Sequence, residues 1–203
     1  MLVSQFDDYS CCTIPGVALR DAVLAALLDG ESSGYDLAKA FDASVANFWM
    51  ATPQQLYREL DRLAEDGLIQ ARVVQQDRRP NKRMYSLTDT GRAALRQFTA
   101  TPPKPSMLRD ELLVKVAALD AGDAAAVRDL VAEFAQRATV KLARYERGRA
   151  VLLDGRTEEQ YLNEAERVGP YLTLLRGISF EQENIRWAEH AVAAIERRIN
   201  ALR

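Results

Sequence analysis

The 203-residue chain has little of the chemistry on which enzymes and metal proteins depend. It contains one histidine, His190, and two cysteines, Cys11 and Cys12, which are neighbours. A Ser-His-Asp or Cys-His arrangement would need that single histidine, and no HExxH, CxxC or glycine-rich phosphate loop occurs. The sequence therefore predicts no catalytic residues, no metal site and no cofactor.

Adjacent cysteines cannot join distant parts of a fold, so the chain is not a disulfide scaffold. No third cysteine and no nearby histidine completes a metal-ligand set. We expect Cys11 and Cys12 to be two thiols in an N-terminal arm that covers residues 1–16.

Long apolar runs are also missing. A membrane span needs about 18 consecutive apolar residues, and the first residues lack the basic start and apolar run of a signal peptide. With 48% apolar and 28% charged residues, the composition is that of a soluble globular protein. We expect a cytoplasmic protein with no membrane partner.

Three prolines in "TPPKPS" mark the clearest break in the chain. Prolines end helices and stiffen linkers. The sequence predicts a first domain at residues 1–100, a proline-rich linker at residues 101–106 and a second domain at residues 107–203.

The first domain has the pattern of three helices, two strands and a further helix. "LRDAVLAALLDG" carries a helical apolar stripe that Gly30 closes. "SSGYDLAKAF" begins with Ser33 three residues before Asp36, which resembles a capping box.

The third helix, in "TPQQLYRELDRLAEDG", has the strongest start signal. Thr52 suits the N-cap, Pro53 suits the first helical position, and Gln55 can close a capping box. Gly67 ends the helix. The predicted buried stripe consists of Leu56, Leu60 and Leu63.

The next segment predicts a β-hairpin. "LIQARVVQQ" and "RMYSL" have strand composition, and "RRPNK" between them suits a tight turn. Thr88 or Asp89 then caps a fourth helix. Although the whole chain has a net charge of -2, this hairpin concentrates cations. They are Arg72, Arg78, Arg79, Lys82 and Arg83.

The second domain has no strand signal and predicts four amphipathic helices, the third of them with a kink at Gly169-Pro170 and the fourth starting at Ser179. That last helix spaces its apolar residues by three and four, as a coiled-coil seam does. We favour a seam between two chains; an ordinary core-facing helix is the alternative. The seam consists of Ile185, Ala188, Val192, Ile195, Ile199 and Leu202.

Three helices followed by a hairpin form the layout of a winged helix-turn-helix. In such a domain the third helix enters the DNA major groove with its N-terminal end first. The wing cations then lie where phosphates would be. The predicted fold class is mainly α: a winged helix-turn-helix with a two-stranded β-wing, plus an all-α C-terminal domain.

Three motifs in this order resemble the PadR family of transcriptional regulators. Residues 34–37, "GYDL", match its Gly-Tyr-acid-aliphatic signature. "QQLYRELDRLAEDGLI" is similar to its recognition helix, and "RRPNKRMYSLTDTGRAAL" to its wing. Three positions depart from the family pattern: Ser33 stands where histidine is common, Glu59 where a small residue is, and Asp61 where lysine is.

The resemblance implies a homodimeric regulator, most often a repressor. Its operator would be an inverted repeat in double-stranded DNA. It also implies a response to a small aromatic or drug-like effector. Trp49 and Trp187 are the candidates for an effector pocket, and core packing is the alternative for both.

The candidate DNA contacts lie on the third helix and the wing. Gln and Arg near the start of the helix can bind base edges. Tyr57 matches the tyrosine of the family's recognition helix, which implies a phosphate contact, and the wing cations can bind phosphates. The set is Thr52, Gln54, Gln55, Tyr57, Arg58, Arg78, Arg79, Lys82 and Arg83.

Two other readings stay open. The acidic residues Glu59 and Asp61 favour a winged-helix module that binds protein and not DNA. A regulator of another winged-helix family, such as the MarR-like one, is the second alternative, although the C-terminal position of the helical domain argues against it.

Overall fold

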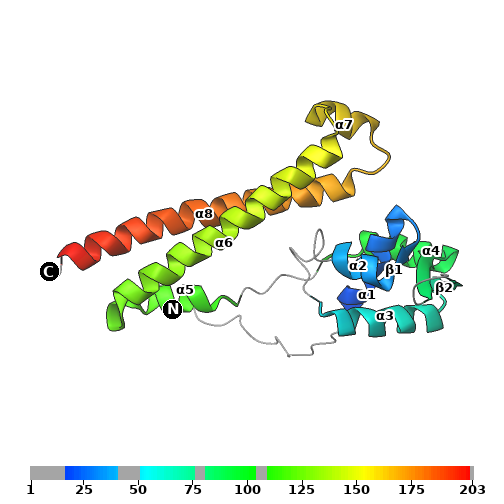
Figure 1. Cartoon of the computed structure of the whole chain (residues 1–203), viewed down its shortest axis with the longest axis horizontal. Coiled ribbons are helices and arrows are strands. Elements are labelled where there is room, and N and C mark those ends of the chain that lie inside the picture. Colours follow the sequence, from blue (N-terminus) through cyan, green and yellow to red (C-terminus); the bar gives the residue numbers. More distant parts are fainter. Residues whose placement is uncertain (1–16, 41–50, 76–80, 104–108, 202–203) are drawn as a thin grey trace, which may run out of the picture. The chain divides into compact units, whose positions relative to one another are not determined.

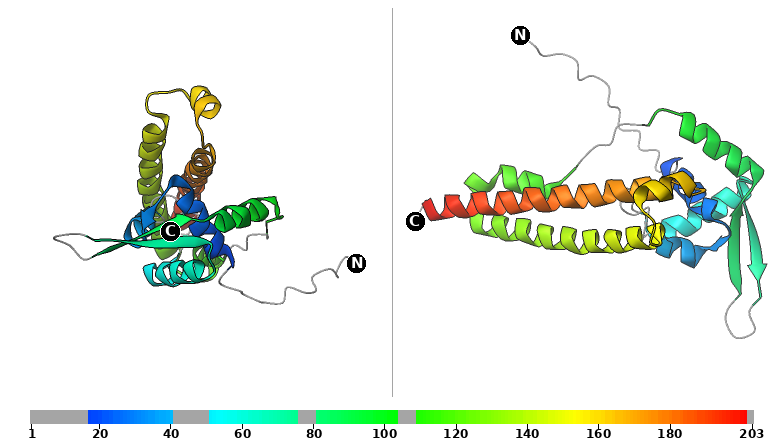
Figure 2. Two further views of the ribbon diagram at one scale, coloured as in Figure 1. Left: turned by 90° about the vertical axis from the view of Figure 1, so that its right-hand side faces the viewer. Right: turned by 90° about the horizontal axis from the view of Figure 1, so that it is seen from above.

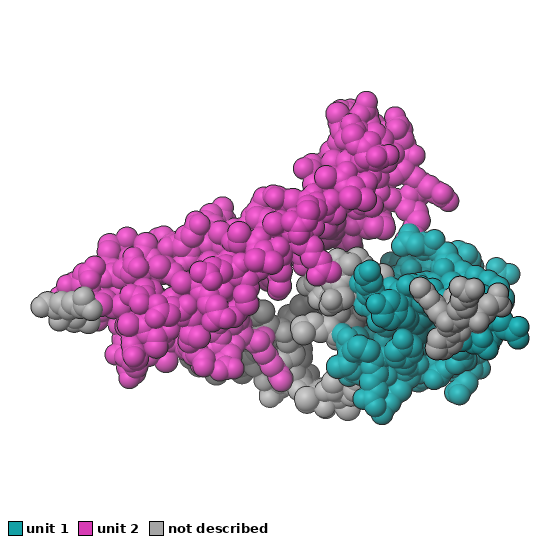
Figure 3. Space-filling model, viewed as in Figure 1, with its two compact units in different colours: residues 1–104 teal, residues 105–203 magenta. Residues whose placement is uncertain are grey.

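The computed structural model describes residues 17–40, 51–75, 81–103 and 109–201. The chain forms two compact units, Met1–Lys104 and Pro105–Arg203, which Figure 3 colours separately. We call them the winged-helix unit and the helical unit. Cys11, Cys12, Trp49, Arg78, Arg79 and Leu202 lie outside the described residues.

The winged-helix unit has the predicted order of helices and strands, with one strand more (Figure 1). Its elements are α1 (Val17–Ala26), the 3-10 turn η1 (Leu27–Asp29), β1 (Ser32–Ser33), α2 (Gly34–Ala40), α3 (Pro53–Glu65), β2 (Ile69–Val74), β3 (Lys82–Leu87) and α4 (Asp89–Ala100).

The sheet is antiparallel, with strand order β1-β3-β2. In the wing, β2 pairs with β3 from Ile69 opposite Leu87 to Val74 opposite Lys82. Ser32 of β1 lies opposite Tyr85 on the other edge of β3. The predicted two-stranded wing is confirmed, and β1 adds a third strand to its sheet. The sequence gives no signal for β1, because a two-residue strand is too short to show alternation of side chains.

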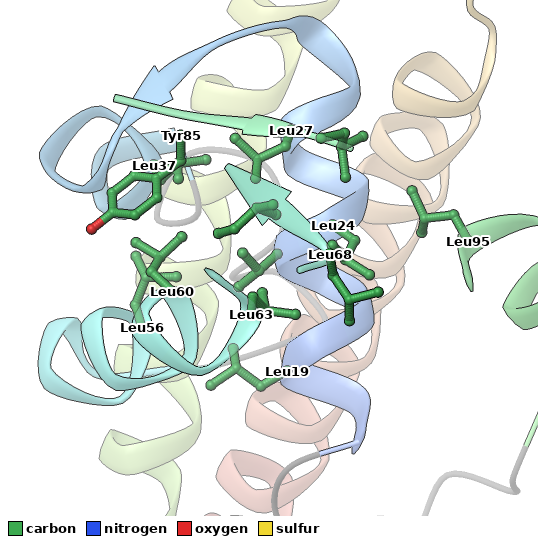
Figure 4. Packing of buried hydrophobic residues seen from close by; sticks show 13 residues of the cluster. Leu19, Leu24, Leu27, Leu37, Leu56, Leu60, Leu63, Leu68, Tyr85 and Leu95 are labelled. Carbon is green, nitrogen blue, oxygen red and sulfur yellow. The ribbon is translucent and has the colours of Figure 1, made fainter. Parts of the chain in front are cut away.

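The core of this unit lies between α1, α2, α3 and the base of the wing. Leu56, Leu60 and Leu63 are buried on one side of α3, as their spacing predicts, and face α1 and the sheet (Figure 4). Tyr85, in the part of β3 that carries Lys82 and Arg83, is 3% exposed and belongs to this core.

Both ends of α3 are fixed by local hydrogen bonds. The Thr52 hydroxyl accepts from the Gln55 N–H at 3.2 Å, and the Gln55 side-chain oxygen accepts from the Thr52 N–H at 2.9 Å. At the other end Gly67 has a φ of 68°, and the Leu68 N–H donates to the Leu63 carbonyl at 2.9 Å. The predicted capping box and glycine stop are confirmed.

Only glycine fits at position 91, in the segment that follows the wing. The Thr88 hydroxyl accepts from the Gly91 N–H at 3.1 Å and donates to the Gly67 carbonyl at 2.7 Å, so Thr88 caps α4 and ties it to the end of α3. A Cβ at Gly91 would lie 2.1 Å from the Leu68 carbonyl oxygen. This close approach explains the glycine in "YSLTDTG", residues 85–91 of the wing motif.

The helical unit is dominated by two long helices that run side by side in opposite directions (Figures 1 and 2). Its elements are α5 (Glu111–Ala117), the 3-10 turn η3 (Leu119–Ala121), α6 (Ala124–Leu153), α7 (Glu158–Glu164) and α8 (Gly169–Ala201). The expected break before Ser179 does not exist, and Gly169-Pro170 begins a helix instead of bending one.

The apolar stripe of α8 packs inside the chain. Ala188 is 0% exposed and Ile195 is 4% exposed, and both contact Val131 and its neighbours on α6, while Val192 and Ile199 are half-buried there. The best-buried residues of the stripe, among those that the structure describes, thus pack as in an ordinary core-facing helix, which was the alternative to a seam between two chains.

Where α6, α7 and α8 meet, a polar network holds the turn together. The Arg149 guanidinium donates to the Tyr171 hydroxyl at 3.0 Å and to Glu158 at 2.9 Å. The Tyr171 hydroxyl donates to the same carboxylate at 2.9 Å. Tyr171 is fully buried against Tyr161, with ring centroids 5.0 Å apart.

None of the helices within the described ranges combines the length and the apolar composition that a membrane span requires.

Candidate nucleic-acid interface

The exposed side of α3 presents a polar row that runs from its N-terminus to its last residue. Gln54, Arg58, Asp61 and Glu65 are spaced by four, three and four residues, so they lie on one side of the helix, and all four are exposed. Arg58 forms no ion pair with any residue in the described ranges. The first half of this row carries the amide and the cation, and the second half carries two acids.

Gln55 has a structural role, because its side-chain oxygen belongs to the capping box. Only that oxygen is used, so the amide nitrogen of this exposed side chain can still donate a hydrogen bond. Thr52 is likewise exposed at the start of α3, with its hydroxyl engaged in the cap.

Tyr57 lies half outside the core, at 44% exposed, and rests on the start of α2. A Cβ at Gly34 would lie 2.4 Å from the ring carbon Cε1 of Tyr57. Glycine at the first position of the "GYDL" motif therefore leaves room for this ring, which fixes where the phenol hydroxyl points.

The cations on the two strands of the wing, Arg72, Lys82 and Arg83, are paired with acids on neighbouring elements. Lys82 contacts Asp36 of α2 at 2.8 Å, and Arg83 contacts Asp61 of α3 at 2.7 Å. Arg72 contacts Glu31, which precedes β1, at 2.7 Å. These three pairs are mostly solvent-exposed, and each one joins the wing to a different part of the helix-turn-helix.

Two of these pairs lower the pKa of the acid. The hydrogen bond from Lys82 lowers the pKa of the Asp36 carboxyl, with a further contribution from the Ser33 hydroxyl. In the same way, the hydrogen bond from Arg72 lowers the pKa of Glu31. The three wing cations that the structure describes are thus each compensated by an acid, in contrast to the uncompensated cationic patch that the sequence suggests.

Arg83 has a second partner, since its guanidinium carbon lies 5.3 Å from the centroid of the Tyr85 ring. An arginine can interact favourably with an aromatic face at this distance. The side chain is therefore held between Asp61 and Tyr85, and it points toward the exposed row of α3.

Glu59 does not belong to the exposed row. It is 7% exposed and lies near Asp21 of α1, which is 6% exposed. Burial raises the pKa of both carboxyls, and Arg20 acts in the opposite direction on each. The interpretation of Glu59 as a surface acid was wrong, because its position on α3 faces the helix bundle and not the solvent.

Trp187 packs in the core of the helical unit. Its ring meets that of Phe134 edge to face, with centroids 6.0 Å apart. This packing accounts for Trp187 without a ligand. No group of histidine, cysteine and acidic residues within the described ranges is arranged to hold a metal ion.

Nothing in the sequence indicates that Glu31, Asp36 and Asp61 pair with the wing. Asp61 stands out in the sequence only as an acid at a position where the family often has lysine. Pairing across 41 and 22 residues, as in Arg72–Glu31 and Arg83–Asp61, depends on the register of the sheet. A single sequence gives no direct signal for that register.

Both halves of the chain match known families. Residues 23–97 match the model of the transcriptional regulator PadR-like family, and residues 108–196 match that of the virulence activator alpha C-terminal domain. A probable transcriptional regulator of Mycobacterium tuberculosis is 33% identical over 193 residues, which are 90% of this chain and 100% of that protein.

The negative transcriptional regulator PadR of Bacillus subtilis is 29% identical, over 88% of this chain and 98% of that protein. Its structure in complex with operator DNA superposes with a TM-score of 0.73 at 28% identity, covering 88% of this chain and 99% of that one. Its structure with p-coumaric acid gives 0.67 at 27% identity, covering 88% and 95%. The chain studied here belongs to the PadR-like family of transcriptional regulators.

Proposed function

We propose that this protein binds an operator as a homodimer and regulates transcription by sequence-specific recognition of double-stranded DNA. The N-terminal half of α3 enters the major groove. There Gln54 and Arg58 contact base edges. The Gln55 amide nitrogen donates a hydrogen bond to the DNA, and Tyr57 contacts a phosphate. The wing tip, with Arg78 and Arg79, contacts the backbone beside the groove.

One observation carries this proposal: Arg58 and Gln54 are exposed side by side on the first turns of α3, with no intrachain ion pair among the described residues. Arginine and glutamine are residues whose side chains can form bidentate bonds with guanine and adenine. Thr52 and Gln55 hold the start of this helix in place, so the two side chains project from a fixed helix end.

The test begins with footprinting on the DNA upstream of the protein's own coding region, followed by titration of the protected site and of a scrambled duplex. Arg58→Ala should weaken operator binding by about 1–3 kcal/mol and relax preference at one base pair per half-site. Arg96→Ala is the matched control, since Arg96 is an exposed arginine of α4. Equal binding of operator and scrambled duplex by the wild type would contradict the proposal.

The dimer that we propose uses the outer side of α6, together with the part of the α8 seam that the chain leaves accessible. Val140 and Val151 are 71% and 77% exposed and lie three helical turns apart on that side. Val140→Asp together with Val151→Asp should give a folded monomer by light scattering. Ile195→Asp should instead unfold the helical unit, because Ile195 is buried within the chain.

We propose repression as the sign of regulation, and a small aromatic acid as the effector class. The support is the likeness to the B. subtilis negative regulator, which has been solved both with operator DNA and with p-coumaric acid. Titration of the operator complex with p-coumaric acid and with benzoic acid tests this. Release of DNA by neither compound would remove the support for an aromatic acid.

A further inference from the structure

Asp61 is an acid that lies directly C-terminal to the half of α3 that is proposed to enter the major groove. It follows Gln54 and Arg58 on the exposed row of α3, and it receives the Arg83 guanidinium of β3 at 2.7 Å. An acid on this surface repels phosphates. Asp61 also pairs with Arg83, a wing cation that could otherwise contact phosphates.

We propose that Asp61 is a specificity-determining residue that suppresses binding to non-operator DNA by holding Arg83 on the recognition helix. This inference rests on the proposed function, because it concerns the same protein–DNA interface. The residue acts through Arg83 and does not itself read a base.

The physical reason lies in the difference between the non-specific complex with random duplex and the specific complex with the operator. Binding to random duplex comes almost wholly from cations that reach phosphates in any register. An Arg83 that is held between Asp61 and the Tyr85 ring must first leave these partners to make such contacts, which weakens binding to random duplex. In the operator complex the position of α3 in the groove also fixes the wing, so less is lost when Arg83 stays in place.

The Asp61–Arg83 pair is easy to release, which makes the effect measurable. The two side chains are 56% and 48% exposed, and exposed ion pairs contribute little to stability. Removing the Asp61 charge should therefore free Arg83 without damage to the fold. The pairing of β3 with β1 and β2 and the buried Tyr85 hold the wing, so it stays in place.

The test compares Asp61→Asn with Glu65→Gln by titration of operator and of a random-sequence duplex at several salt concentrations. Asp61→Asn should bind random duplex at least about threefold more tightly at low salt, and its log affinity should fall more steeply with log salt by about 0.9 per subunit. The ratio of operator to random affinity should fall. Glu65→Gln removes the same charge from the same exposed row without releasing a wing cation, so its salt slope should match that of the wild type.

A double-mutant cycle with Arg83→Gln decides whether Asp61 acts through Arg83. In the Arg83→Gln background, Asp61→Asn should no longer change the salt slope. An Asp61→Asn variant that matches the wild type, or one that matches Glu65→Gln in every measurement, would overturn the inference while leaving DNA binding intact. If the wild type binds operator and random duplex alike, it is the proposed function that has failed.

Discussion

Gly91→Ala tests how tightly the recognition helix, the wing and α4 are joined. A Cβ at this position would lie 2.1 Å from the Leu68 carbonyl oxygen, whereas ordinary contact begins at 3.4 Å. The start of α4 would have to retreat from the end of α3 by about 1.3 Å, the difference between these two distances.

That retreat would disturb three hydrogen bonds. The Thr88 N–H donates to the Leu68 carbonyl at 3.2 Å, and the Thr88 hydroxyl reaches the Gly67 and Leu68 carbonyls at 2.7 and 3.0 Å. Overpacking costs about 1–3 kcal/mol and each lost hydrogen bond about 0.5–1.5 kcal/mol, offset by up to about 1 kcal/mol from the better helix propensity of alanine. If all three hydrogen bonds are lost, the net loss is about 2–7 kcal/mol.

The assay is equilibrium urea unfolding followed by far-ultraviolet circular dichroism, at one fixed protein concentration. Gly148→Ala is the control, because Gly148 lies within α6 and an added Cβ would be 3.8 Å from the nearest atom, Cδ2 of Leu174. That variant should gain about 0.5–1 kcal/mol. If Gly91→Ala were as stable as the wild type, the close approach of α4 to Leu68 would not exist in solution.

Three further variants test the packing of the two units. Leu60→Ala removes a fully buried side chain of α3 and should cost about 2–5 kcal/mol in unfolding free energy. Tyr171→Phe removes the hydroxyl that bonds Arg149 and Glu158, and should lower the unfolding free energy of the helical unit by about 1–3 kcal/mol. Glu59→Gln should stabilise the protein at neutral pH: burial raises the folded-state pKa of Glu59, so its destabilising contribution grows as pH rises from the ordinary value of 4.5 through the raised one. Urea titrations at pH 4 and pH 7 check the last of these, and a stability gain that is larger at pH 4 would contradict it.

Local signals in the sequence were sufficient for most of the winged-helix unit. The start of α3 is specified by Thr52 and Gln55 themselves, and its end by Gly67, so the capping box and the stop appear where the residues place them. The buried stripe of α3 follows from helical spacing alone. Contacts of this kind lie within a few residues of each other, which is why a single sequence reveals them.

Features that depend on the packing of distant segments were not predictable in the same way. The charge row of α3 does not show that Asp61 meets Arg83. The charge of Glu59 suggests a surface acid, although its spacing from Leu56 and Leu63 places it on the buried side of α3. The stripe of α8 has the spacing of a seam in either case, and only the position of α6 shows that Ala188 and Ile195 are covered within the chain.

Tethered cleavage measures most directly whether the N-terminal half of α3 is the part that enters the groove. In a background with Cys11→Ser and Cys12→Ser, an iron chelate is attached to Gln54→Cys or to Glu65→Cys, at the two ends of the exposed row of α3. At concentrations that saturate the operator, the chelate at position 54 should cut inside each half-site, beside the base pairs that determine binding. The chelate at position 65 should cut weakly and toward the flank. Strong cutting inside the half-sites from position 65, with none from position 54, would contradict the proposed orientation of the helix.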